Sequence, residues 1–495
     1  MKIIRSVSSL ALLAVVVASC YLFAVTRAPQ QGGRILALYA EGDALTAVDL
    51  FENDPALAMD FEDKFALVRS YFLLDRMREA KQVVDVLLKE QPDNSDIRAY
   101  SAALAPGYSM AIKAISEAKE LSEEETLLLK LSAASTNRRY QDALRLIQSN
   151  PDLPHLLDTS ELRLYNLLRA RVYFNTEMYD QAHKVLAKSV EMFSDFAPLY
   201  ELLIKVKVRR NALAGLAEDI NVYEALGGSE FTIEFNRGIL YERSGDLKKA
   251  IEHYTNAIEL KPKLGKIYLR RGNCYRYTDQ KKLAAEDYSV AYNNDPSLAE
   301  ALVNLAILKM ESGEYRVARQ LYDEVVSSHP DFQSGYVERG RFLHANGLVE
   351  LAEQDYVKAM ELAPTDPYCS YLAALLHVEH MNLERAKRFI DITMQRDSSY
   401  PRIYVVLGDY HRLKGDDRAA IAEYNNALRL DGRNLEALRK LAQVYIEVRE
   451  PANAVNAASR ALQVYDKDLF SMYYLGLGRL GRAKLAKHRP SSSRF

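Results

Sequence analysis

Residues 231–264 read FTIEFNRGILYERSGDLKKAIEHYTNAIELKPKL, and the pattern of this segment recurs along the chain. Alanines stand 34 residues apart in an unbroken series from Ala250 to Ala454. A glycine or alanine precedes each of them by twelve residues, from Gly238 onward, and in most units a tyrosine follows by four. A fixed period of this length is typical of a repeat architecture in which each unit packs on its neighbours.

The residue types within one period predict two antiparallel helices. The small residues allow the helices to approach closely, and the tyrosine fills the remaining space. In the step Gly245-Asp246, glycine ends the first helix and aspartate caps the second. Pro262 then stops the second helix.

This pattern resembles the tetratricopeptide repeat, which places Leu-Gly, Tyr, Ala, an aromatic residue and Pro at fixed offsets in 34 residues. The resemblance implies an all-α fold, a right-handed superhelical solenoid of antiparallel helix pairs with a concave groove. Nine contiguous units are predicted over residues 163–468, after degenerate repeat-like helices over residues 28–162. Residues 469–481 resemble one more first helix that caps the array, and residues 482–495 are predicted to be a basic, disordered tail.

The N-terminus is predicted to be a targeting or membrane segment over residues 1–27. Lys2 and Arg5 precede an uncharged stretch from Ser6 to Thr26, as long as the ~20 residues of a bilayer-crossing helix. An uncleaved signal anchor, a lipoprotein signal with lipidated Cys20 in the run VASC, and a cleaved secretory signal all remain open. In each case the bulk of the chain is expected on the extracytoplasmic side, and two of the three anchor it to the membrane.

The composition excludes several classes of protein. The hydrophobic fraction of 48% and the charged fraction of 27% are those of a folded chain. The net charge of −2 provides no field for nucleic acid. Three cysteines are too few for a disulfide framework or a four-cysteine zinc site.

No motif predicts an enzyme. Residues 476–481 match G-x-G-x-x-G, but they fall in a predicted helix without the βαβ unit that a dinucleotide site requires. His377 and His380 have neither the order nor the spacing of a zinc protease motif. The repeats also leave no segment of ~100 residues for a catalytic domain. We therefore expect no catalytic activity, cofactor, metal or small-molecule ligand.

The resemblance implies that the first helix of each unit lines the groove and binds partner proteins. Lys266, Arg270 and Asn236 are similar to part of a carboxylate clamp, although two further clamp positions carry Glu201 and Lys205. Two cations and an amide can fix a peptide carboxylate by charge-assisted hydrogen bonds. The candidate peptide-binding residues are Asn236, Lys266, Arg270, Asn273, Asn304, Arg341, Tyr368 and Tyr371.

These features predict a membrane-tethered scaffold that binds an acidic or C-terminal peptide of a partner protein. Assembly or secretion of bacterial envelope components, with the solenoid in the periplasm, is the expected setting. A second hypothesis is a subunit of an exopolysaccharide export or cell-wall synthesis complex, in which Tyr368 and Tyr371 stack on a bound sugar. The basic residues from Arg479 to Arg494 are either a solvated terminus or a contact with an anionic surface.

Overall fold

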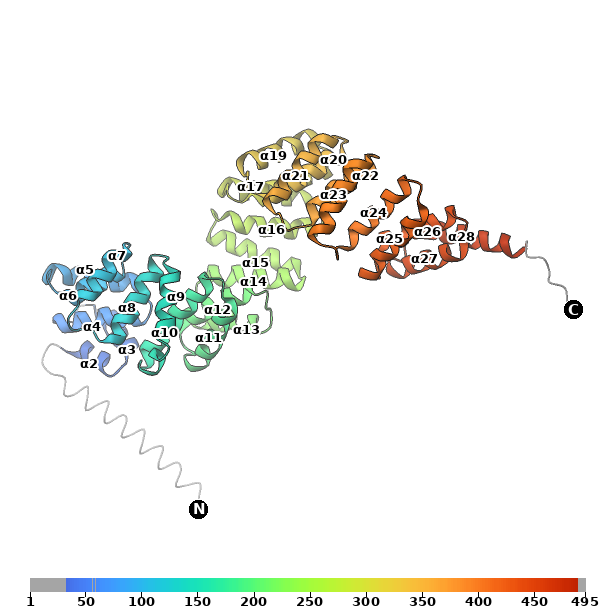
Figure 1. The fold of residues 1–495 in the computed structure, drawn as a ribbon. Coiled ribbons are helices and arrows are strands. Elements are labelled where there is room, and N and C mark those ends of the chain that lie inside the picture. Colours follow the sequence, from blue (N-terminus) through green and yellow to red (C-terminus); the bar gives the residue numbers. More distant parts are fainter. Residues whose placement is uncertain (1–32, 56, 58, 488–495) are drawn as a thin grey trace, which may run out of the picture. The chain divides into compact units, whose positions relative to one another are not determined.

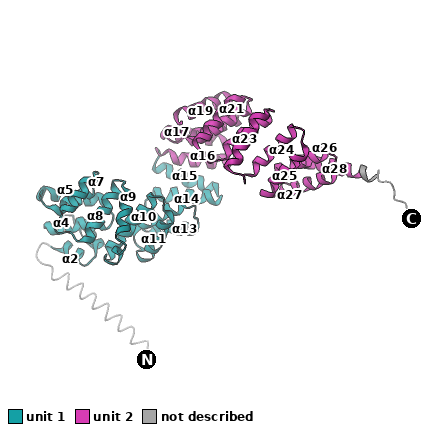
Figure 2. Ribbon diagram, viewed as in Figure 1, with its two compact units in different colours: residues 1–262 teal, residues 263–495 magenta. Residues whose placement is uncertain are grey.

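The structure is a computed structural model that describes residues 33–55, 57 and 59–487. These residues form 27 α-helices and one short 3-10 helix, with no strand among them, which confirms the predicted all-α class. The chain divides into two compact units, unit 1 with residues 1–262 and unit 2 with residues 263–495 (Figure 2).

Unit 1 consists of helices α2 to α15, joined by short turns (Figure 1). Their bounds are α2 Arg34–Ala40, α3 Ala44–Asn53, α4 Phe61–Leu73, α5 Met77–Glu90, α6 Ser95–Ala103, α7 Tyr108–Glu117, α8 Glu123–Thr136, α9 Tyr140–Ser149, the 3-10 helix Leu153–His155, α10 Thr159–Asn175, α11 Tyr179–Met192, α12 Ala197–Arg209, α13 Leu216–Ala225, α14 Glu230–Ser244 and α15 Leu247–Leu260.

Unit 2 consists of helices α16 to α28, in which even-numbered helices are the first and odd-numbered helices the second of each repeat. Their bounds are α16 Gly265–Tyr277, α17 Lys281–Asn294, α18 Ala299–Glu311, α19 Tyr315–Ser328, α20 Gln333–Ala345, α21 Val349–Leu362, α22 Tyr368–Glu379, α23 Leu383–Arg396, α24 Pro401–Leu413, α25 Asp417–Leu430, α26 Leu435–Glu447, α27 Pro451–Val464 and α28 Leu469–Lys487.

The second helices of unit 2 begin at residues 281, 315, 349, 383, 417 and 451, in the register of the alanine series. Each first helix packs against the second helix that follows it. The turn between them places one residue in the left-handed region at the same point of each repeat. That residue is glycine in three repeats, as at Gly415, but it is Asp279, Met381 or Arg449 in the others.

The small residues let the two helices of a repeat pack closely. A Cβ atom on Gly408 would stand 2.3 Å from the ring of Tyr424, and one on Gly272 would stand 2.8 Å from Tyr288. Both tyrosines and the series alanines, such as Ala420, are fully buried. The predicted role of glycine, alanine and tyrosine in the helix pair is therefore confirmed.

Residues 33–175 of unit 1, called here the N-terminal bundle, pack differently. One apolar core extends from Ile35 to Val172. Helices α4 and α10 pack against each other although five α-helices lie between them in sequence. Nη1 of Arg171 donates to Oδ1 of Asp75 at 2.7 Å, and Oγ of Ser160 donates to the carbonyl of Gly42 at 3.0 Å. The N-terminal bundle thus closes on itself.

The structure describes the last predicted helix but not the predicted N-terminal segment. Among the described residues, no helix has the length and hydropathy needed to cross a bilayer. The predicted segment 1–27, including Cys20, lies outside those residues. The predicted end of the last helix at residue 481 needs correction, because α28 continues to Lys487. Residues 482–487 contain alanine, leucine and lysine, which favour helix, and nothing that stops one.

Candidate functional site

Polar side chains link consecutive first helices of unit 2. Nδ2 of Asn304 on α18 donates to Oδ1 of Asn273 on α16 at 3.1 Å. The hydroxyl of Tyr288 donates to the same oxygen at 2.8 Å, and Nη1 of Arg276 lies 3.5 Å from Oδ1 of Asn304. The structure therefore brings together two of the predicted site residues, Asn273 and Asn304.

The same kind of link recurs further along the unit. Nε2 of His344 on α20 lies 2.8 Å from Oε2 of Glu379 on α22, and this hydrogen bond lowers the pKa of Glu379. Nη2 of Arg412 on α24 donates to Oε2 of Glu447 on α26 at 2.5 Å. These contacts hold the first helices side by side. The resulting surface, called here the polar strip, comprises Asn273, Arg276, Asn304, Arg341, His344, Glu379, Asp409, Arg412, Lys440 and Glu447.

Sequence reasoning missed the charge pairs of the polar strip, although a signal for them exists. Both members of the pair His344–Glu379 recur two repeats later as Arg412–Glu447. The glycine and alanine of the small-residue series also alternate from Gly272 onward. A period of two repeats, compared position by position, would have identified these partners.

Arg341 and the two predicted tyrosines lie on adjacent first helices. Arg341 is exposed, and its Nη1 lies 3.3 Å from Oε1 of Glu338. Tyr368 is half-buried and stacks on Tyr371, with ring centroids 6.2 Å apart. Tyr371 is only 8% exposed and packs edge-on against Tyr400, and burial raises its pKa to about 12. Tyr371 thus belongs to the core, and only Tyr368 offers ring surface to a peptide or a sugar.

The three predicted clamp residues differ in accessibility. On α16, Lys266 is exposed and Arg270, one helical turn later, is half-buried. Asn236 lies in unit 1, is 6% exposed, and donates its Nδ2 to the carbonyl of Thr232 at 2.6 Å. Because its amide serves its own helix, Asn236 offers a peptide little surface. Lys266 and Arg270 remain candidate ligands for a carboxylate.

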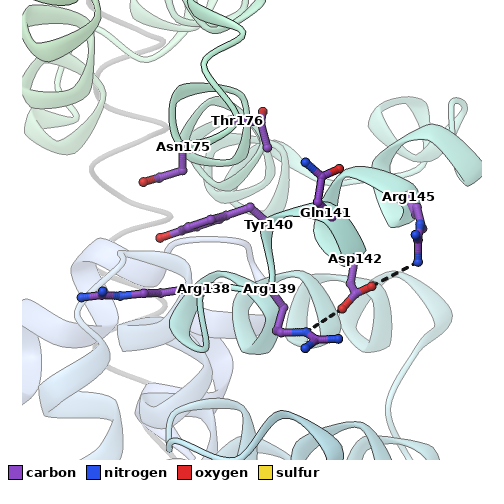
Figure 3. A pocket seen from close by; sticks show the side chains of 8 residues that line it. All are labelled: Arg138, Arg139, Tyr140, Gln141, Asp142, Arg145, Asn175 and Thr176. Atoms are coloured by element: carbon purple, nitrogen blue, oxygen red, sulfur yellow. Dashed lines mark hydrogen bonds and ion pairs between the residues drawn. The ribbon is translucent and has the colours of Figure 1, made fainter. Parts of the chain in front are cut away.

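Unit 1 contains a polar pocket that sequence reasoning missed. The cavity measures about 470 Å³ and lies at the turn before α9 (Figure 3). Nε of Arg139 donates to Asp142 at 2.8 Å, and Nη1 of Arg145 lies 3.3 Å from the same carboxylate. Three arginines around one aspartate leave an excess of positive charge. The lining residues are Arg138, Arg139, Tyr140, Gln141, Asp142, Arg145, Asn175 and Thr176.

A second cavity of about 620 Å³ lies among α3, α4 and α5 of unit 1. Its wall is partly apolar, and a hydrogen bond from Arg76 lowers the pKa of Glu52 at its edge. It is lined by Phe51, Glu52, Pro55, Met59, Lys64, Leu67, Tyr71, Glu79, Gln82, Val83 and Val86.

Neither histidine of the run His377–His380 is arranged for metal binding. His377 is fully buried, burial lowers its pKa, and its Nε2 lies 3.2 Å from Oε2 of Glu353. Within the described ranges, no group of three or more His, Cys, Asp or Glu side chains could hold a metal ion.

Comparison with known proteins finds several that are similar to this chain. Two of the curated relatives are human: a protein O-mannosyl-transferase, 24% identical over 29% of this chain and 17% of its own length, and the mitochondrial import receptor subunit TOM70, 21% identical over 54% of this chain and 46% of its own length. The chain thus spans less than half of either relative. The crystal structure of a tetratricopeptide repeat protein from Parabacteroides merdae is similar to 51% of this chain, and the match covers 100% of that protein's chain. The sequence identity is 18% and the TM-score is 0.44.

Models of the tetratricopeptide repeat match three stretches of the chain, residues 232–264, 303–367 and 401–434. These stretches hold the small residues, buried tyrosines and hairpin turns described above. Over these three stretches the chain carries tetratricopeptide repeats.

Proposed function

We propose that this chain is a protein-binding scaffold that receives a segment of a partner protein on the polar strip of unit 2. The observation that carries the proposal is the link between consecutive first helices, as in the pairs Asn273–Asn304 and Arg412–Glu447. These links present side chains from many repeats along one surface. Because the helices are already ordered, most of the ordering cost of binding falls on the partner segment.

The charges of the strip favour a partner segment that carries carboxylates. Arg276 and Arg341 lie on the strip, Lys266 lies on the same helix as Arg276, and a cation can hold a carboxylate by charge-assisted hydrogen bonds. Glu379 and Glu447 further along the strip are paired with His344 and Arg412, so they repel an acidic segment less than free carboxylates would. An acidic or C-terminal peptide is therefore the proposed ligand.

The proposed setting rests on the N-terminal sequence. The uncharged stretch from Ser6 to Thr26 supports a scaffold tethered to a membrane, with its repeats on the extracytoplasmic side. Assembly or secretion of envelope components is the proposed role, without catalysis by this chain. The relative named as an import receptor subunit supports a receptor-type role for such a surface.

Site-specific photocrosslinking in cells tests the proposal. A photoreactive amino acid replaces Arg341 on the strip or Tyr368 on the adjacent first helix α22, and Arg418, which is exposed on the second helix α25, serves as the matched control. We expect a discrete crosslinked partner from the two strip positions and none from the control. Equal crosslinking at Arg418 would contradict the proposal.

Charge reversal tests the proposed ligand chemistry. Lys266→Glu together with Arg270→Glu should weaken capture of the crosslinked partner and reduce its salt sensitivity. Lys358→Glu, a charge reversal at a half-exposed position of the second helix α21, is the control. Unchanged capture by the double variant would contradict the proposed carboxylate site, but it would not contradict the proposed scaffold function.

A further inference from the structure

Among the residues that the structure describes, nothing covers one side of helix α28. Its other side packs on α27, where a Cβ atom on Gly478 would stand 2.8 Å from Val455. Residues spaced by four, three and four lie on one side of a helix. The uncovered side, called here the α28 stripe, consists of Leu469, Tyr473, Gly476 and Leu480, of which the three large residues are 79%, 61% and 63% exposed.

The α28 stripe contains the small residue that the repeats use for close packing, Gly476, but no aromatic ring of the described residues packs on it. The position of Gly476 is called here the slot. Gly476 occupies the same place in its repeat as Gly408, whose added Cβ would stand 2.3 Å from Tyr424. At Gly476, nothing in the described part of the chain lies within 4 Å of an added Cβ. Helix α28 also continues to Lys487, through the residues where the earlier repeats turn into a second helix. The slot is therefore formed and uncovered.

The α28 stripe is complementary to itself in an antiparallel arrangement. When two α28 helices cross midway between residues 474 and 475, Tyr473 of each helix lies opposite Gly476 of the other. Leu469 of each helix then lies opposite Leu480 of the other. The largest side chain of the stripe thus meets its only glycine, which is how tyrosine and glycine pack inside the repeats.

The charges around the α28 stripe favour the same arrangement. In this register the two copies of Arg479 lie roughly 14 Å apart along the axis, and the two copies of Arg482 lie further apart. A parallel pair would instead place each arginine beside its own copy, where like charges repel. The antiparallel pair is therefore favoured over the parallel one.

We propose that two copies of this chain associate through α28, in an antiparallel pair in which each Tyr473 packs over Gly476 of the other copy. A single helix crossing lies at the low end of specific interfaces in buried area, so the dimer forms in a concentration-dependent equilibrium. It would carry two polar strips and thereby raise the avidity for a partner that is itself multivalent.

Sedimentation equilibrium of the full chain in mild detergent tests the dimer. We expect a monomer–dimer equilibrium at concentrations up to the order of 100 µM. Gly476→Leu and Tyr473→Glu should each raise the dissociation constant at least about tenfold. The fold should survive Gly476→Leu, because the added side chain meets open space in the monomer. Asn456→Leu, which adds the same side chain to an exposed position of α27, should leave the dimer intact.

Cysteine crosslinking tests the orientation. In a Cys20→Ala background, Leu469→Cys and Leu480→Cys chains are oxidised separately and as a mixture, while Cys274 and Cys369 are buried. The antiparallel pair places residue 469 beside residue 480 of the other copy. It separates residue 469 of one copy from residue 469 of the other by roughly 16 Å along the axis, and the same holds for residue 480. The mixture should therefore crosslink several-fold more than either chain alone.

Three outcomes would overturn the proposal: a wild-type monomer at all concentrations, a dimer insensitive to both stripe substitutions, or equal crosslinking by each single variant alone. Photocrosslinking at Arg341 and Tyr368 does not involve α28. The proposed function and the proposed dimer are therefore tested by separate experiments.

Discussion

The N-terminal bundle and unit 2 use the same helix hairpin, but they connect it differently. In unit 2 the helices pack mainly on their chain neighbours, and the first helices touch one another in sequence. In the bundle the first helix α10 also packs on α4, from which five α-helices separate it in sequence. Regular repeats therefore keep their first-helix surface available to a partner, whereas the degenerate repeats use that surface to close their own core.

Charge pairs show the same contrast. Nε of Arg69 on α4 donates to Oε1 of Glu125 on α8 at 2.8 Å, across two hairpins. In unit 2, Nε of Arg339 donates to Oδ2 of Asp355 at 2.8 Å within one hairpin, and its Nη1 donates to Oδ1 of Asp323 of the preceding hairpin at 2.9 Å. The pair in the bundle skips a hairpin and ties distant repeats together, whereas the pairs of Arg339 join a repeat only to itself and to its neighbour.

Overpacking one repeat of unit 2 should have the largest effect. Gly408→Leu forces a side chain against Tyr424 and should cost roughly 3 kcal/mol of unfolding free energy. Hydrogen exchange should accelerate in α24, α25 and the repeats beside them, and it should stay unchanged in the N-terminal bundle. Gly476→Leu in dilute solution is the matched control, because that slot is uncovered. Faster exchange in the bundle would contradict nearest-neighbour packing.

Removing a cross-hairpin partner should have a smaller but wider effect. Glu125→Ala leaves the guanidinium of Arg69 and the hydroxyl of Tyr100 without their acceptor at partly buried positions. We expect a loss of about 2 kcal/mol, spread over α2 to α10 together. Exchange measured segment by segment checks this. Glu361→Ala, which removes one member of the exposed pair with Lys358, is the control. A loss confined to α8 would show that the bundle is not one unit.

The attachment of α28 should depend on pH through Asp468. Arg439 on α26 donates to this buried carboxylate, and its hydrogen bonds lower the pKa of Asp468. When the pKa of a carboxylate is lower in the folded state than in the unfolded state, its charge stabilises the fold. This stabilisation is fully present at pH values above the unfolded-state pKa of about 3.9, and it is lost as the pH falls through the folded-state pKa. Asp468→Asn should cost about 1 kcal/mol near neutral pH.

The comparison of thermal midpoints at about pH 7 and about pH 3 checks this assignment. The wild type should exceed Asp468→Asn at neutral pH, and the difference should shrink in acid. A difference that persists unchanged at the lower pH would assign the effect to something other than the carboxylate charge.

Relief of a strained turn should give the smallest change in the free energy of unfolding. Unlike the other substitutions, it should stabilise the fold. Met381 adopts the left-handed conformation, with φ of 56°, at the place where Gly415 stands in the next repeat. Met381→Gly should stabilise α22 and α23 by up to about 1 kcal/mol. The thermal midpoint should rise slightly. Gly415→Met is the inverse control and should lower it; a rise there would contradict the account of the turn.

The hairpins of unit 2 could be predicted from sequence because their determinants are local. The alanine series from Ala250 to Ala454 is fully buried, and helices begin in its register. In most repeats the small residue is matched to a ring only sixteen residues away, as Gly272 is to Tyr288, so one repeat contains both halves of the contact.

The closure of the N-terminal bundle could not be predicted in this way. Asp75 and Arg171 lie 96 residues apart and follow no period. The candidate site was predicted only in part for a related reason. Tyr371 and Asn236 stand at positions that the resemblance assigns to the groove, yet the packing of neighbouring helices turns them inward. Such rotation depends on residues of the next repeat, as Tyr371 on Tyr400 shows.

Native-state hydrogen exchange of the full chain tests the contrast most directly. Residues 33–175 should open with one common free energy, because contacts across hairpins tie them together. Residues of unit 2 should open with free energies that vary from repeat to repeat, as a nearest-neighbour array requires. A single opening free energy throughout unit 2, or graded opening within the N-terminal bundle, would contradict the account.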